Sequence, residues 1–366
     1  MHLEDLANEL LLQIFHSCTT LSSVLSLATT SRRFHSLLQS QKLPILFNVF
    51  DAQYGPLHDA MQLVTHNATQ PVHHLRSAPY SLALLQQLLS TGRTASQYEQ
   101  LYPFKKWKFD SENRRLLSDA ERWKVRRAVY RLFLYSRAFH NARYTRTMRM
   151  LPHVVQERLE LLHNWTTDEL AEMEDVRSVM RELVRGICPS NGSIQRKFKK
   201  RFPDDGGGLL GFNIHLNYPP PSPTNANTVR GGIEEQFHSY LGHGVAEAKA
   251  VPGRAVKFAA GGGLHDMGAE GWGDDVLHYY VVEDMLKLDP GQILFLREHL
   301  GMGGWDIGSS GRKDMVKGFV YGLGEWFENN GETFGQTLEL VVTQRGENVE
   351  EFKEDVLERE RGVVIE

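Results

Sequence analysis

The chain has 366 residues and a net charge of −4, and 41% of its residues are hydrophobic while 23% are charged. This is the composition of a globular protein with room for two or three domains. The longest apolar runs fall far short of the roughly 20 residues of a membrane span, and no secretory leader is evident. The two cysteines, Cys18 and Cys188, lie in no paired motif, which indicates free thiols in a cytoplasmic or nuclear compartment.

The N-terminal stretch, residues 3–38, carries the strongest pattern of apolar residues. Its first half, residues 3–15, predicts a helix that is apolar over most of its circumference. Two further short helices are expected, one capped by Ser22 or Ser23 and the other by Ser31. A neighbourhood of about forty residues is too small to cover so much apolar surface. Part of it is therefore expected to contact another part of the chain or another protein.

Three sequence blocks occur in this stretch in a fixed order: L-x-x-L-x-x-E-L-L-x-x-I-F, L-x-x-V-L-x-L-A and T-S-R-R-F-H-x-L-L. In order and spacing they resemble the F-box. The F-box usually has a proline where this chain has Ala7. Since proline there occupies the first turn of a helix, alanine should preserve the helix. The alternative is an ordinary helical N-terminus that packs on its own domain.

The resemblance implies a three-helix F-box domain at residues 1–43. Such a domain docks on the Skp-type adaptor of an SCF (cullin–RING) ubiquitin ligase, and the rest of the chain recruits an unknown protein target. No reaction would occur on this chain, because the partners in the ligase supply the chemistry. The residues expected to carry docking are Leu6, Leu10, Ile14, Phe15, Leu25, Leu27, Phe34 and Leu37.

The next residues introduce a helical domain, expected at 57–202. Before it, residues 45–54 read as a helix or an extended connector, since Pro44 and a Gly-Pro pair interrupt the chain on either side. Helices are expected at residues 57–66 and 80–90, with Gly92 as the C-terminal stop of the second.

Two capping boxes mark the later helices of this domain. Ser118 to Glu121 opens a helix that continues to Phe139, and Thr166 to Glu169 opens one that stops near Gly186. A further helix is expected at residues 154–164. In total the domain would contain about six helices.

The C-terminal third has a different character. Residues 203–273 are rich in glycine and proline and are expected to form an irregular insertion. Residues 274–366 are expected to be mostly helical and to pack on the middle domain, with a strand-like run at Thr337–Thr343 that a helix could replace. The predicted fold class is therefore mainly α.

Charge is unevenly distributed along the chain. Residues 105–149 hold 14 Lys/Arg against 4 Asp/Glu, and residues 266–366 hold 22 Asp/Glu against 9 Lys/Arg. Such an asymmetry can indicate a nucleic-acid-binding surface in the basic part, or it can indicate that the two parts face each other. We favour the second interpretation. Within the basic part, the run YPFKKWKF at residues 102–109 could stack on bases, but its aromatic rings are expected inside with the lysine heads in water.

The cluster that most resembles a catalytic or metal site comprises His265, Asp266, Asp274, Asp275, His278 and Glu283. Asp275 and His278 could share one face of a helix as metal ligands, although acidic residues at a helix start also suit the helix dipole. The glycine-rich segments lack the ending that grips phosphate, and no nucleophile elbow occurs. No catalytic, cofactor-binding or metal-binding residue is therefore predicted.

Two functional hypotheses follow. In the first, the chain is a binding protein of the F-box type, and membranes and nucleic acid are not expected partners. In the second, residues 57–366 hold a metal protein or an enzyme and the F-box is an appended feature. The segments WKVRRAVYRLF at 123–133 and GWGDDVLHYYVVEDMLKL at 271–288 also look like the long F-box-containing proteins of filamentous fungi.

Overall fold

The computed structural model describes residues 3, 6–141, 143, 144, 148, 149, 151–187, 282, 285–300 and 332–365. In these residues the chain forms helices and loops without a strand, so this part is mainly α as predicted. The helices are α1 (Asn8–Ser17), α2 (Leu21–Thr30), α3 (Arg32–Ser40), α4 (Lys42–Tyr54), α5 (Leu57–Val64), α6 (Leu82–Lys106), α7 (Asp119–Phe139), α8 (Pro152–His163), α9 (Thr167–Ile187), α17 (Pro290–Leu300), α19 (Phe334–Gln344) and α20 (Val349–Glu358).

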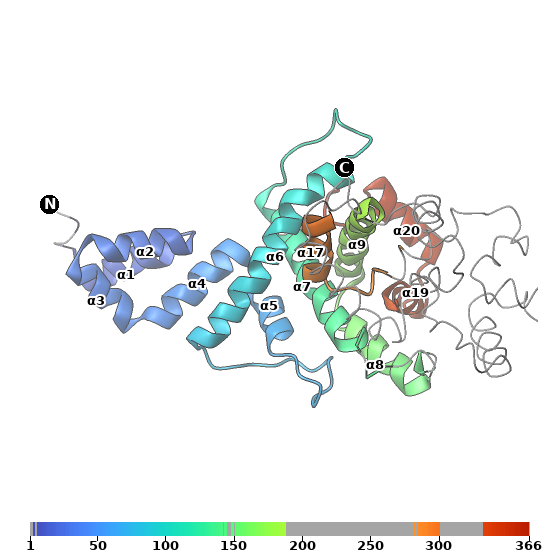
Figure 1. Ribbon diagram of the computed structural model, residues 1–366, viewed down its shortest axis with the longest axis horizontal. Helices are drawn as coiled ribbons and strands as arrows, with labels where there is room; N and C mark the ends of the chain where they lie inside the picture. The colour runs from blue at the N-terminus through green and yellow to red at the C-terminus, as the bar shows by residue number, and fades with distance from the viewer. Residues whose placement is uncertain are drawn as a thin grey trace, which may run out of the picture.

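Helices α1, α2 and α3 form an N-terminal lobe at one end of the molecule (Figure 1). Helix α3 packs on α1 and α2, and α4 packs on all three before it reaches α5 and α6. The residues 45–54 are therefore a helix and not an extended connector. Pro44 lies in the first turn of α4, where its missing N–H has no intrahelical partner, so it does not interrupt the chain.

The larger part of the molecule, called the body here, consists of α5–α9, α17, α19 and α20 (Figure 1). Helix α7 lies at its centre and packs on α5, α6, α9 and α17. Buried side chains occur around most of the circumference of this helix. They include Val125, Val129, Leu132 and Phe133, which lie at helical spacing in the sequence. A helix buried over most of its surface needs neighbours on every side, and the C-terminal helices supply some of them.

The local capping signals are confirmed where the sequence is explicit. Ser118 and Glu121 form the reciprocal bonds of a capping box at the start of α7. At α9 the N–H of Glu169 donates to Thr166 Oγ1 at 3.3 Å, and the N–H of Thr166 donates to the Glu169 carboxylate at 3.0 Å. Both boxes satisfy N–H groups that have no intrahelical partner.

Three expected helix boundaries are wrong. Helix α1 begins at Asn8 after an extended Ala7, not at residue 3. The side chain that caps α2 is Thr20, which accepts from the N–H of Ser23 at 3.1 Å. Gly92 does not end a helix but lies inside the 25-residue α6, against Tyr54 of α4.

The C-terminal segment, expected to be mostly helical, is helical where it is described. The strand-like run Thr337–Thr343 belongs to α19, because Leu338, Val341 and Val342 recur at helical spacing and are all buried. Asp289 opens α17: its carboxylate accepts from the N–H of Gln292 at 2.8 Å. The expected insertion at 203–273 and a large part of the expected helical segment at 274–366 lie outside the described residues.

Candidate functional site

The surface of the N-terminal lobe holds the residues expected to dock on a partner. Leu10 and Leu25 are exposed, at 47% and 57% of their full surface. Leu6, Ile14, Leu27 and Leu37 are half-buried. Phe15 and Phe34 are buried, and their rings meet edge to face at 6.5 Å between centroids. The two rings therefore hold the helices together, while the leucines provide the apolar surface.

The lobe is built by short-range bonds between neighbouring helices. Ser31 is at once the C-cap of α2 and the N-cap of α3, where it accepts from the N–H of Phe34 at 3.3 Å. The guanidinium of Arg33 donates to Leu6 O and to Asn8 Oδ1, each at 2.7 Å. These bonds fix the start of α1 against α3 and so position Leu10 one turn further along.

Helix α4 completes the lobe and covers part of its apolar surface. Asn48 Nδ2 donates to His16 O at 2.8 Å, and the N–H of Leu21 donates to Gln53 Oε1 at 3.0 Å. Part of the apolar surface of the first three helices is thus covered by this chain. Contact with another part of the chain was one of the two alternatives that the sequence left open. The exposed leucines, Leu10 and Leu25, remain outside that covered region.

The far end of α4 is held by the body. Two carbonyl groups of its last turn accept bonds from α7: Arg126 Nη1 donates to Gln53 O at 2.6 Å and Tyr130 Oη to Tyr54 O at 2.7 Å. Arg126 is a charged residue in the sequence, yet it is only 9% exposed. Its acceptor is a backbone carbonyl, so no residue type in the sequence signals the bond.

The basic segment at residues 105–149 forms several ion pairs with α9 in the described residues. Helices α7 and α9 pack together, so their charged rows face each other. Among the C-terminal acids, Asp289 acts electrostatically on Arg137 of α7, and many of the others lie outside the described residues, so the expected pairing with C-terminal acids stays a prediction. The pairs with α9 include Lys106–Asp175 (2.7 Å), Lys108–Glu182 (3.0 Å), Arg127–Glu172 (2.7 Å) and Arg131–Glu169 (3.1 Å).

The run YPFKKWKF divides between core and surface. Tyr102 and Trp107 are buried as expected, but Phe104 and Phe109 are exposed at 60% and 92%. The run continues α6 to Lys106, and a residue two positions from Tyr102 falls on the opposite side of a helix. Lys106 does not keep its head in water either, because Asp175 of α9 takes it.

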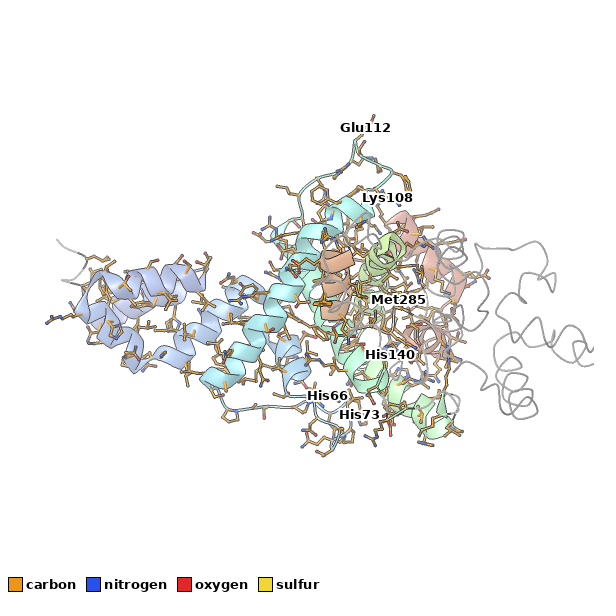
Figure 2. The ribbon with its side chains drawn as sticks, viewed as in Figure 1. His66, His73, Lys108, Glu112, His140 and Met285 are labelled. Atoms are coloured by element: carbon orange, nitrogen blue, oxygen red, sulfur yellow. The ribbon has the colours of Figure 1, made fainter. Side chains whose placement is uncertain are left out.

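A buried histidine at the end of α7 joins two C-terminal segments (Figure 2). The N–H of Thr333 donates to His140 Nε2 at 3.3 Å, so Nδ1 carries the proton and donates to Lys287 O at 3.2 Å. Burial holds the pKa of His140 well below 6.5, and the charge of Lys287 lowers it further. The imidazole is therefore neutral and acts as a structural link.

No group of three or more His, Cys, Asp or Glu side chains within the described residues is placed to hold a metal ion. The expected candidates from His265 to His278, together with Glu283, lie outside them. The described helices include none with the length and apolar character of a membrane span.

A scan against family models, a search of curated proteins and a search of solved structures each found no match to the chain. The resemblance to the F-box therefore rests on the residues of the N-terminal lobe themselves.

Proposed function

We propose that the chain is a substrate adaptor of the F-box type. The N-terminal lobe would dock on the Skp-type adaptor of a cullin–RING ubiquitin ligase, and the body would recruit a protein target in the cytoplasm or nucleus. The observation that carries the proposal is that the lobe with the F-box-like motif order presents Leu10 and Leu25 to solvent at the far end of the molecule (Figure 1).

The exposed leucines suit such an interface. A few apolar side chains usually supply most of the binding energy of a protein interface, provided that their backbone is already fixed. Here the buried rings of Phe15 and Phe34 and the Arg33 bonds fix that backbone. The chain itself would contribute proximity, because it would hold a target lysine near the ubiquitin carrier.

The decisive variant replaces both exposed leucines, Leu10→Asp with Leu25→Asp. Two charges in a desolvated interface should reduce capture of a purified Skp-type adaptor by about a hundredfold or more. Both side chains are exposed, so the variant should keep the thermal unfolding midpoint of the wild type. Adaptor capture is measured by pull-down and by surface plasmon resonance.

The matched control is Leu75→Asp with Leu357→Asp, two leucines exposed at 73% and 79% in the body. It adds the same charge at a distance from the lobe and should leave capture unchanged. If the Leu10→Asp, Leu25→Asp protein captures the adaptor as the wild type does, the docking proposal is wrong.

A further inference from the structure

The loop between α6 and α7, residues 107–118, presents apolar side chains to solvent. Phe109 is 92% exposed and Leu116 82%, and Phe104 at the end of α6 is 60% exposed. The loop projects from the body in Figure 1, and Figure 2 places Lys108 near its base and Glu112 near its tip. Several large apolar side chains exposed together on one loop are typical of a binding surface.

The base of this loop is fixed to the body. Trp107 is fully buried, and the guanidinium groups of Arg115 and Arg359 lie over its ring at 5.6 and 5.9 Å. Arg115 also forms two bonds to the Glu121 carboxylate, at 2.6 and 2.7 Å. Arg359 of the C-terminal segment pairs with Asp110 at 3.0 Å. The backbone at the base of the loop is thus fixed before any partner arrives, which lowers the entropy cost of binding.

Positive charge lies beside the exposed aromatic rings of this surface. Arg114 lies over the ring of Phe104 at 5.6 Å and has no carboxylate partner in the part of the chain that the structure describes. Lys108 lies 4.8 Å from the ring centre of Phe109, and its side chain stays 48% exposed despite its pair with Glu182. A partner for this surface therefore needs apolar groups next to negative charge.

We propose that the α6–α7 loop binds a segment of the recruited protein in which acidic residues flank an apolar anchor. This inference rests on the proposed function, since it names the surface by which the body takes its target. The loop lies at the end of α6 remote from the N-terminal lobe, so the two sites leave room for both partners (Figure 1).

The charges favour a protein segment over nucleic acid or an anionic membrane. Binding to a phosphate backbone draws on many uncommitted lysines and arginines. In residues 104–117 five Lys/Arg stand against two acids, but three of the five already pair with carboxylates of the body. The surface is therefore suited to a few specific charges around an apolar contact.

The test uses three fluorescein-labelled peptides of about 12 residues, a length that spans a typical peptide-binding surface. The first carries acidic residues around Leu and Phe, the second replaces Leu and Phe by Ser, and the third replaces the acids by Lys. Fluorescence anisotropy with the full chain should show the first bound about tenfold or more tightly than either other. Added salt should weaken this binding.

The variant Phe109→Ser with Leu116→Ser should lose about tenfold or more in affinity for the first peptide. The control Leu75→Ser, at a similarly exposed leucine in another loop, should bind as the wild type does. Equal binding of the peptide by wild type and loop variant would overturn the inference. So would loop-dependent binding of a single-stranded oligonucleotide or phosphatidylserine vesicles in place of the peptide.

Adaptor capture, measured on the same preparations, tests the proposed function independently of peptide binding. The loop variant should capture the Skp-type adaptor as the wild type does, and the Leu10→Asp, Leu25→Asp variant should bind the peptide normally. Loss of adaptor capture in the loop variant would contradict the inference, because the loop would then act through the N-terminal lobe.

Discussion

His66, just beyond the end of α5, is, with His140, a histidine whose ionisation should make stability depend on pH. Burial, followed by the charges of Arg76 and Arg137, lowers the pKa of His66 from 6.5 to about 4. Its Nδ1 is buried without a hydrogen-bond partner in the described structure. Between about pH 6.5 and about pH 4 the unfolded chain therefore binds a proton that the folded chain does not.

The free energy of unfolding should accordingly fall as the pH decreases through this window. Urea denaturation of the wild type at several pH values measures that slope, and His66→Asn should reduce it to the part that His140 contributes. The control is His153→Asn, at an exposed histidine on α8, which should keep the slope of the wild type. An unchanged slope in His66→Asn would contradict the assignment.

At the scale of single residues, sequence reasoning found side chains whose role depends on near neighbours. Ser31 was expected to cap a helix and does, since a cap acts within three residues. Sequence reasoning could not predict that Phe109 is exposed, because its exposure depends on where α6 ends and on which body residues hold Trp107. Nor could it separate Leu10 from Phe15 within the docking set: both are apolar, and only packing decides which is covered.

At the scale of elements, the crossing of α4 and α6 depends on Gly92. A Cβ atom at this position would lie 2.9 and 3.0 Å from side-chain atoms of Tyr54 and 3.2 Å from Phe50, both on α4. Gly92→Ala gains about 1 kcal/mol in helix propensity but must push α4 away, which typically costs about 1–3 kcal/mol. We expect net destabilisation, measured by chemical denaturation.

Gly186→Ala provides the matched control, because Gly186 is also helical and nothing lies within 4 Å of an added Cβ atom there. That variant should be neutral or stabilised by up to about 1 kcal/mol. If both alanine variants gain stability alike, the close crossing of α4 and α6 does not constrain the fold.

The helix starts marked by a capping box were the part of the fold that sequence predicted best. A capping box such as Ser118 to Glu121 acts within four residues, so its chemistry is visible in the sequence. The prediction that Gly92 ends a helix was wrong, because a glycine that ends a helix and one that allows a neighbouring helix to approach look the same in sequence. The run Thr337–Thr343 is rich in β-branched residues, which favour strands. It nevertheless forms a helix that packs against α8 and α9.

At the scale of the whole molecule, Asp175 of α9 joins three distant segments. Its buried carboxylate accepts from Tyr102 Oη at 2.6 Å, from Lys106 Nζ at 2.7 Å and from the N–H of Val363 at 3.0 Å. Burial raises the pKa of Tyr102, and the charge of Asp175 raises it further, so the phenol remains a donor. Asp175 thereby ties α6 and the C-terminal tail to α9.

Asp175→Asn should destabilise the protein by roughly 3–5 kcal/mol, because it leaves the charge of Lys106 buried without its partner. Glu339→Gln removes the acid of the exposed Lys353–Glu339 pair and should cost at most about 1 kcal/mol. Urea denaturation measures both. Equal effects of the two substitutions would show that Asp175 contributes no more than a surface charge.

The sequence could not have located these long-range links. It showed an excess of Lys/Arg at residues 105–149, but the partners in α9 follow from the packing of α6 and α7 on α9. The mainly α class was predictable because helical periodicity is local. The assembly of α17, α19 and α20 around α7 and α9 was not, since it joins residues far apart in the chain.

The clamp of Arg126 and Tyr130 on the last turn of α4 has a geometric consequence. It suppresses swinging of the N-terminal lobe, because any rotation of α4 would break two partly buried bonds to backbone carbonyls. Helix α6 then extends from its crossing with α4 at Gly92 to Lys106 at the start of its loop, roughly 21 Å. Two molecules bound at these opposite ends would be kept at a constant spacing, so only their own flexibility could bring them together.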